Sequence, residues 1–300
     1  MPTRRLVIDI GTNSVLALLA EITNNGLTVI FDEKKTTRLG QGMAGSGRLS
    51  LDSIERTAEA VDAFMKKDRY DSALLLGTEA LRASSNANEF QACIYKQTGE
   101  RVTVLSGEKE AELNYTGALY RLPLTGSKIA VIDVGGGSTE IAYGNSHNMI
   151  CAISMPLGAS RLYESVSVDS LEKYMAGAAR IIMDTKGGFV FDDIDLLVAT
   201  GGTITSIAAI DVGIKKYDPA AVHGYHLSVK RIREISSRFE GLDSAKRKGL
   251  IPFDPERAEL ILPGAGIFLS ILDILRRDKL TVSTGGLRFG AALCPDLIDK

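Results

Sequence analysis

One short motif occurs twice in the chain, and this duplication is the strongest constraint on the fold. VIDIGTNS at residues 7–14 and VIDVGGGS at residues 131–138 each run from apolar residues through an aspartate to a glycine and small residues. A strand that ends in this way makes a tight turn, because glycine adopts conformations closed to other residues and lets a ligand approach the backbone N–H groups. We therefore expect two related domains, each opening with such a turn.

Length and charge are consistent with a two-domain globular protein. The chain has 300 residues, 45% of them hydrophobic and 24% charged, with a net charge of −2. This length exceeds one ordinary core, and this charge gives no bulk attraction to nucleic acid or to an anionic membrane. Residues 122–128 are rich in Pro, Thr, Gly and Ser, so we place a boundary there. The predicted domains are residues 1–124 and 125–300, with a final helix after about 287 packing back on the first domain.

Periodicity predicts an α/β fold in which each half opens with a β-meander. The first half also carries a helix over Leu51–Lys67, with Ser50 as its N-cap. The other predicted helices cover Asn88–Gln97 and Glu108–Tyr120. The predicted strands are Arg5–Asp9, Leu16–Ile22, Leu27–Asp32, Ser72–Leu76, Val102–Leu105, Ile129–Asp133, Glu140–Tyr143 and Met149–Ser154.

Cysteine use and the N-terminal residues bear on location. Cys93, Cys151 and Cys294 lie far apart and form no metal-binding pattern, which favours reduced thiols and a cytoplasmic setting. The apolar run after the first arginines stops at Asp9, too short for a signal peptide or a membrane span. We expect a cytoplasmic protein that binds neither nucleic acid nor membranes.

Further glycine turns follow later strands. VATGGTITSIA at 198–208 and VSTGGLRFGAA at 282–292 both run from a strand through Thr-Gly-Gly into a helix, and LLLGTEALR at 74–82 is a looser version. A helix N-terminus at a glycine turn favours anions, so these turns are candidate phosphate sites. Close packing explains a Gly-Gly before a helix equally well, and a single glycine turn is often only a hairpin connector. A P-loop motif is absent from the sequence.

Taken together, these motifs resemble the exopolyphosphatase/guanosine pentaphosphatase (Ppx/GppA) family of the actin, hexokinase and Hsp70 superfamily. The resemblance implies two actin-like, ribonuclease H-like domains with an active-site cleft between them, in the short form without a C-terminal HD-type region. The stretches that carry it are VIDIGTNS (7–14), RLGQGMAGSGRLSLDSIERT (38–57), GTEALRASSNANEF (77–90), LSGEKEAEL (105–113), VIDVGGGSTEI (131–141), ISMPLGASRL (153–162), VATGGT (198–203), VHGYHLS (222–228), RAELILPGAGI (257–267) and GLRFG (286–290).

The resemblance implies magnesium-dependent hydrolysis of a terminal phosphoanhydride, on inorganic polyphosphate or alternatively on guanosine pentaphosphate. It assigns Glu110 as the base that activates water and Arg82 as a phosphate-binding cation. From the residues alone, Glu110 equally fits a first-turn acidic residue favoured by the helix dipole, and Arg82 fits a surface helix arginine. A kinase or ATPase of the wider superfamily and a non-catalytic phosphate or nucleotide sensor are further possibilities.

The same resemblance assigns Asp133 and Glu140 as the ligands of Mg²⁺ or another divalent cation, although Glu140 could also be an ordinary exposed strand residue. Asp9 occupies the corresponding place in the first turn. The turn hydroxyls could instead stabilise the turns themselves. The remaining candidate phosphate-binding residues are Gly11, Thr12, Asn13, Ser14, Gly135, Gly136, Gly137, Ser138, Thr139, Gly201, Gly202 and Thr203.

Several residues in the matched stretches keep open roles. Arg38, Arg161, Arg257 and Arg288 could line a substrate channel or tie the domains together, whereas His223 fits a structural role better than a catalytic one. Symmetric dimers are common among soluble proteins, so a homodimer is also expected.

Overall fold

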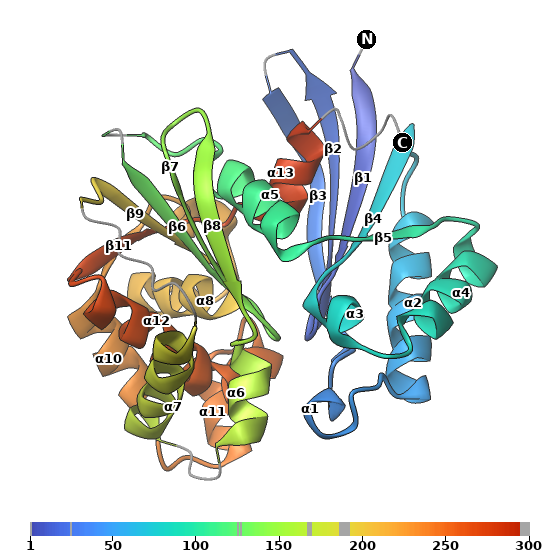
Figure 1. Ribbon diagram of the computed structural model, residues 1–300. Helices are drawn as coiled ribbons and strands as arrows, with labels where there is room; N and C mark the ends of the chain where they lie inside the picture. Colours follow the sequence, from blue (N-terminus) through green and yellow to red (C-terminus); the bar gives the residue numbers. More distant parts are fainter. Residues whose placement is uncertain are drawn as a thin grey trace. The chain divides into compact units, whose positions relative to one another are not determined.

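The computed structural model describes residues 2–24, 26–124, 126, 128–166, 170–185 and 193–294. These residues form two compact units (Figure 1): unit 1 extends to Gly117 and includes the segment from Leu287 onward, and unit 2 comprises Ala118–Gly286. The division falls before the boundary placed at residues 124 and 125. Composition located the turn residues, but contacts decide the division: the Ser283 hydroxyl donates to the Ala118 carbonyl (2.7 Å) and ties that residue to unit 2.

Unit 1 is built on a five-stranded sheet in the order β3-β2-β1-β4-β5. Strands β1 to β3 form an antiparallel meander, and β4 and β5 continue the sheet in parallel with β1. In Figure 1, helices α2 and α4 cover one face of this sheet and α13 covers the other. The strands are β1 (Thr3–Ile10), β2 (Ser14–Thr23), β3 (Gly26–Thr36), β4 (Ser72–Gly77) and β5 (Val102–Val104). The helices are α1 (Met43–Ser46), α2 (Leu51–Met65), α3 (Glu79–Ala83), α4 (Ala87–Thr98), α5 (Gly107–Leu119) and α13 (Leu287–Leu293).

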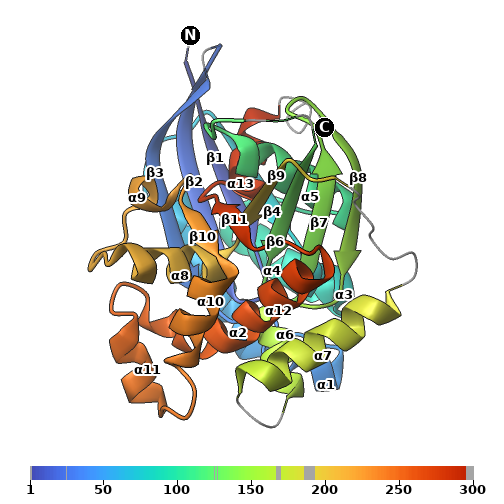
Figure 2. The ribbon, with the colours of Figure 1, turned by 90° about the vertical axis from the view of Figure 1, so that its left-hand side faces the viewer.

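Unit 2 repeats this arrangement in a six-stranded sheet of order β10-β11-β9-β6-β7-β8. Helices α7, α10 and α12 lie over one face of it (Figure 2). Its strands are β6 (Ile129–Val134), β7 (Thr139–Gly144), β8 (Met149–Met155), β9 (Leu196–Thr200), β10 (His226–Ser228) and β11 (Lys279–Val282). Its helices are α6 (Ala159–Ser165), α7 (Leu171–Asp184), α8 (Gly202–Val212), α9 (Pro219–Val222), α10 (Val229–Ser237), α11 (Ser244–Leu250), the 3-10 helix η1 (Pro255–Leu260) and α12 (Ile261–Ile274).

The two sheets share one topology. In each, the first three strands form an antiparallel meander, and the first of them then pairs in parallel with the strand that follows a helix. This confirms the predicted α/β class with two related domains, as the duplicated motif and the resemblance to the actin superfamily implied. The predicted helix over Leu51–Lys67 is also confirmed, because the Ser50 side chain caps α2 by accepting from the Ser53 N–H.

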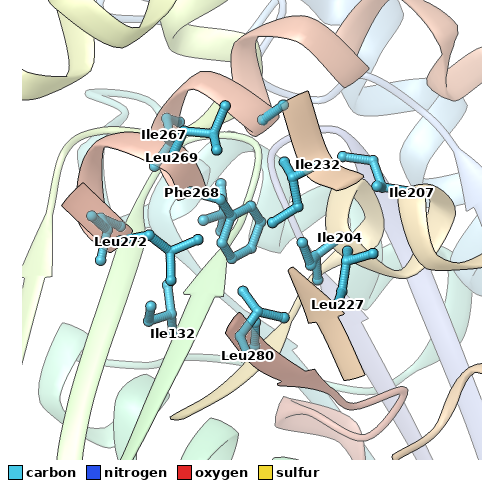
Figure 3. Packing of buried hydrophobic residues seen from close by; sticks show 14 of the residues in the cluster. Ile132, Ile204, Ile207, Leu227, Ile232, Ile267, Phe268, Leu269, Leu272 and Leu280 are labelled. Carbon is cyan, nitrogen blue, oxygen red and sulfur yellow. The ribbon is translucent and has the colours of Figure 1, made fainter. Parts of the chain in front are cut away.

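Each unit has its own apolar core. In unit 2, α12 is buried along most of its length, and Phe268 packs among Ile232 of α10, Ile204 of α8 and Leu280 of β11 (Figure 3). In unit 1, strand residues such as Ile8 pack against Phe64 of α2 and Phe90 of α4. These cores hold the strand ends in place, and the motifs follow directly from those ends.

The C-terminal helix α13 belongs to unit 1. Buried Arg5 of β1 donates through Nη1 to the Ala292 carbonyl (2.5 Å) and the Cys294 carbonyl (3.3 Å). Arg288 forms a two-bond ion pair with Asp32 of β3, at 2.6 Å and 2.8 Å. Two arginines therefore fasten the end of the described chain to the first sheet. Within the described residues, Cys93, Cys151 and Cys294 carry free thiols, and every helix is too short or too polar to cross a membrane.

Candidate active site

The two motif turns close with the same hydrogen bond. The Gly11 N–H donates to the Ser14 carbonyl (3.1 Å), and the Gly135 N–H donates to the Ser138 carbonyl (3.0 Å). A β-carbon on either glycine would lie 3.1 or 3.3 Å from that same carbonyl oxygen, closer than ordinary packing. The sequence repeat is therefore a repeat of backbone geometry, and it specifies the same narrow turn in both units.

In unit 1, three parallel strands end side by side. Ile10 of β1 pairs in register with Gly77 of β4, which pairs with Val104 of β5. The first turn, α3 and α5 all begin at this edge, and the Thr78 N–H donates to the Ile10 carbonyl (3.3 Å). The carboxyl ends of strands are where α/β sheets place their ligand sites, so this edge is the candidate site of unit 1.

Arg82 and Glu110 meet at this edge. The guanidinium of Arg82 in α3 donates through Nη1 to Glu110 Oε2 and to the Leu105 carbonyl, both at 2.8 Å. Its Nη2 donates to Glu79 Oε2 at 3.1 Å. Glu110 lies in the first turn of α5 and is 6% exposed. Arg82 is thus held by two carboxylates and a carbonyl, unlike an ordinary arginine on a helix surface.

Burial raises the pKa of Glu110 above its usual value, because removing a carboxylate from water disfavours its charged form. The positive charge of Arg82 and its hydrogen bond lower that pKa and offset part of the effect. The negative charge of Glu79 raises it further. A buried carboxylate with a raised pKa beside one fixed cation is a typical feature of acid–base sites.

In unit 2, the candidate metal ligands form a cross-strand pair. Asp133 of β6 lies directly opposite Glu140 of β7, so both side chains point to the same face of the sheet. Glu140 is 2% exposed, and its Oε1 accepts a hydrogen bond from the Ser154 hydroxyl (2.7 Å). Glu140 is therefore a buried residue and not an exposed strand residue. Thr200 of β9 pairs with Asp133 from the other side.

The first turn lacks such a pair. Asp9 of β1 lies opposite Leu16 of β2, the position that corresponds to Glu140 in the second turn. The duplication therefore repeats the backbone but not the chemistry: only the second turn carries two adjacent carboxylates.

Mg²⁺ prefers carboxylate oxygens and keeps several waters or phosphate oxygens among its ligands. Asp133 and Glu140 fit this requirement, since they offer oxygen ligands from adjacent positions. Across the described ranges, no group of three or more His, Cys, Asp or Glu side chains could hold a metal ion. The protein part of a site at Asp133 would consist of this pair, with waters or phosphate oxygens completing it.

Residues at the start of α6 hold the second turn by hydrogen bonds to its carbonyl groups. The Ala159 N–H donates to the Gly135 carbonyl, and the Ser160 N–H donates to the Gly136 carbonyl, both at 2.9 Å. Arg161 adds a bond from Nε to the Gly137 carbonyl (3.0 Å). The Arg161 backbone N–H also donates to the Gly136 carbonyl. These four hydrogen bonds restrict the movement of the turn.

The N-terminus of α8 lies beside the second turn. Gly201, with a φ of +104°, cannot carry a β-carbon without approaching the Val134 carbonyl to 2.6 Å. Gly202 lies under the guanidinium of Arg257, whose Cζ would be 2.3 Å from an added β-carbon. Arg257 forms an ion pair with Asp254 at 3.6 Å. The glycines thus allow a cation to approach the helix N-terminus closely.

Several predicted phosphate-binding hydroxyls serve the fold. Thr139 is fully buried and donates to the Leu157 carbonyl, and the buried Thr203 hydroxyl donates to the Leu260 carbonyl (3.4 Å). In the first turn, the Asn13 side-chain amide donates to the Ser14 hydroxyl (3.1 Å). Thr12 turns its methyl group toward Gly40. These contacts support a structural role for the hydroxyls of Thr139 and Thr203.

The residues with open roles also have defined surroundings. Arg38 is exposed with a φ of +52°, and its N–H donates to the Asn13 carbonyl (2.8 Å), so its backbone supports the first turn. Arg288 ties α13 to β3. His223 accepts from the Thr284 N–H at 3.3 Å, and burial lowers its pKa, in line with a structural role.

The described geometry can be compared with known proteins. The model of the Ppx/GppA phosphatase family matches residues 18–294. The chain belongs to this family. It is 30% identical to Exopolyphosphatase 2 of Mycobacterium tuberculosis, over 97% of this chain and 98% of that protein. It is 24% identical over its whole length to a guanosine-5'-triphosphate,3'-diphosphate pyrophosphatase of Aliivibrio fischeri and spans 60% of that protein.

A solved structure agrees with this assignment. The crystal structure of the Aquifex aeolicus member of the Ppx/GppA family is 30% identical in sequence and superimposes with a TM-score of 0.81. The match covers 100% of this chain and 99% of the other. The fold described above is therefore that of the Ppx/GppA family.

Sequence reasoning passed over three residues that contact the candidate site residues. Glu79 bonds to Arg82, Ser154 bonds to Glu140, and Gly158 lies against the second turn. All three lie in the stretches that carry the family resemblance, and Ser154 belongs to β8, the strand after β7. Only the pairing of strands and helices reveals what each of them contacts.

Proposed function

We propose that this chain is a magnesium-dependent exopolyphosphatase, which hydrolyses the terminal phosphate of inorganic polyphosphate. Membership of the Ppx/GppA phosphatase family supports hydrolysis of a phosphoanhydride. The observation that carries the proposal is the ion pair of Arg82 with buried Glu110 at the carboxyl ends of β1, β4 and β5. The similarity to Exopolyphosphatase 2, which extends over almost the full length of both chains, supports polyphosphate as the substrate.

Glu110 is the proposed general base. A base works best when its pKa lies near the working pH, and burial raises the pKa of Glu110 in that direction. The Arg82 contact fixes the carboxylate at one oxygen. In the proposed step, Glu110 accepts a proton from the attacking water while the bond between the terminal phosphorus and the bridging oxygen breaks. The products are inorganic phosphate and a polyphosphate shortened by one unit.

Arg82 and the turn N–H groups are the proposed partners of the phosphate oxygens. A planar guanidinium matches the geometry of a phosphate group. The narrow turns at Gly11 and Gly135, and the α8 N-terminus at Gly201, present backbone donors of the kind that bind anions. Binding at such donors stabilises charge that accumulates on the transferred phosphoryl group.

Asp133 and Glu140 would hold the magnesium ion. When bound, it would supply positive charge that neutralises the phosphate chain. The buried position of Glu140 and its bond to Ser154 would keep one carboxylate fixed before the ion arrives. We also propose that the protein is cytoplasmic and that it forms a homodimer.

A second candidate substrate is guanosine pentaphosphate. The similarity to a guanosine-5'-triphosphate,3'-diphosphate pyrophosphatase across the whole chain favours it, although the chain spans only 60% of that relative. The same residues would act, with a nucleotide in place of the polyphosphate tail. A non-catalytic sensor is a third candidate, but it would not need the buried, fixed carboxylates Glu110 and Glu140.

The test compares phosphate release from long-chain polyphosphate, guanosine pentaphosphate and ATP, each at matched concentrations of terminal phosphate. Polyphosphate should give the highest kcat/KM. Glu110→Gln should lower kcat by about 10²–10⁴-fold while polyphosphate still binds, since a general base contributes about that factor. Glu112→Gln, on the same helix but with a half-exposed side chain, is the matched control. Undiminished turnover by the Glu110 variant would refute the base role, and a preference for pentaphosphate would establish the second candidate.

A further inference from the structure

Glu79 is a nearly buried carboxylate that no part of the proposed reaction uses. It lies in the first turn of α3, three residues before Arg82, with its side chain 13% exposed. Its Oε2 accepts from Arg82 Nη2 at 3.1 Å. Glu110 binds the other terminal nitrogen, Nη1, at 2.8 Å. The guanidinium of Arg82 therefore donates to two carboxylates, each through a different terminal nitrogen.

This pairing differs from an ordinary ion pair on a helix surface. Lys109 and Glu112 have the same spacing on α5, but their side chains are 34% and 48% exposed. Exposed pairs of that kind contribute little, because water competes and the long side chains lose freedom. The Glu79–Arg82 pair, by contrast, is largely removed from water and adjoins a third charged group.

The arrangement fixes the direction of Arg82. The Leu105 carbonyl and Glu110 both accept from Nη1, and Glu79 accepts from Nη2. A planar guanidinium held at both terminal nitrogens cannot rotate about its long axis without breaking at least one bond. Loss of Glu79 would remove the bond to Nη2 and leave the bonds to Nη1 in place.

We propose that Glu79 is a positioning residue for the reaction: it orients Arg82 toward Glu110 and shares the positive charge of Arg82 between two carboxylates. This inference rests on the proposed role of Glu110 as the base. Glu79 itself is not a catalytic residue, because it acts through Arg82.

The negative charge of Glu79 shifts the pKa of Glu110, the proposed base, in a known direction. A second negative charge near Glu110 disfavours its ionisation, and Glu79 accordingly raises the pKa of Glu110. Glu79→Gln removes this repulsion and leaves the whole charge of Arg82 to Glu110. The pKa of Glu110 should therefore fall in the variant. Glu110 would then be ionised at lower pH but would be a weaker base.

The experiment measures kcat/KM for polyphosphate across pH in the wild type, in Glu79→Gln and in the control Glu112→Gln. The acid limb should move to lower pH in the Glu79 variant and stay in place in the control. The plateau of kcat should fall while KM changes little. Thermal unfolding of each variant accompanies the kinetics. A residue that only stabilised the fold would change the melting temperature and leave the pH profile where it was.

A direct titration gives a readout independent of activity. In protein labelled with ¹³C at the glutamate carboxyl groups, the Glu110 signal is assigned by its absence in Glu110→Gln. Its midpoint should lie at lower pH in Glu79→Gln than in the wild type. An unchanged midpoint, with an unchanged acid limb, would overturn the proposal.

Glu79→Asp covers the case in which the Gln variant does not fold. It keeps the charge but shortens the reach to Arg82, so kcat should fall without movement of the acid limb. Wild-type kcat in this variant would overturn the positioning role. The proposed function fails separately: full activity of Glu110→Gln would refute the base, whereas an inactive Glu110→Gln with an unshifted Glu79→Gln would refute only this inference.

Discussion

Gly158 offers the sharpest test of how the second turn is held. A β-carbon at this position would lie 2.4 Å from the carbonyl carbon and oxygen of Gly136 and from the nitrogen of Gly137. All three atoms are backbone, so no side chain can rotate out of the way. Gly158 itself has a φ of −133° and a ψ of 163°, a conformation open to any residue. The effect of Gly158→Ala is therefore steric and does not come from backbone strain at residue 158.

The expected size follows from the distances. Moving the contact from 2.4 Å to ordinary van der Waals separation requires a displacement of about 1 Å. A displacement of about 1 Å in groups that position a substrate can lower the rate on the order of 10²-fold. Overpacking a well-filled site costs about 1–3 kcal/mol of folding free energy. For a unit of this size, that loss lowers the melting temperature by about 2–12 °C.

Phosphate release and thermal unfolding check both numbers. The matched control is Gly249→Ala in α11, where an added β-carbon meets nothing within 4 Å. That variant should keep full activity and gain up to about 1 kcal/mol, because alanine suits a helix better than glycine. If Gly158→Ala matched Gly249→Ala in both kcat/KM and melting temperature, the idea that the entry to α6 supports the second turn would be wrong.

Three further predictions concern ion pairs and carboxylates. Arg288→Ala should lower the free energy of unfolding in urea by about 1–3 kcal/mol, since it removes two charge-assisted bonds to largely buried Asp32. Arg4→Ala, at a side chain 43% exposed, should change it by less than about 0.5 kcal/mol, and equal losses would contradict the reasoning. Glu110→Gln should stabilise the fold at neutral pH. The pKa of Glu110 is raised in the folded state, so its contribution is fully present below the unfolded value of 4.5 and is lost as pH rises through the folded value. The gain in folding stability of Glu110→Gln should therefore vanish at acid pH. A gain that did not depend on pH would contradict this prediction. Asp133→Asn should raise the Mg²⁺ concentration needed for half-maximal phosphate release, whereas an unchanged requirement would remove Asp133 from the metal site.

Much of the local structure could be predicted because its causes lie within a few residues. Ser50 caps α2 as expected, since a serine hydroxyl accepts the N–H three positions later. The meander strands followed from their runs of apolar and β-branched residues. The spacing of Asp133 and Glu140 predicted a pair across one hairpin, and their register confirms that they lie opposite each other.

The amino-acid sequence by itself determined two matching turns, the strands that lead into them and the cap of α2, because these depend on nearest neighbours along the chain. Tertiary structure alone decided that Arg82 meets Glu110, that burial raises the pKa of that carboxylate, and that Gly158 supports a turn some twenty residues earlier. Loss of solvent and contact between distant segments arise only when the sheets assemble. A linear pattern of residues cannot specify how much water a side chain will lose.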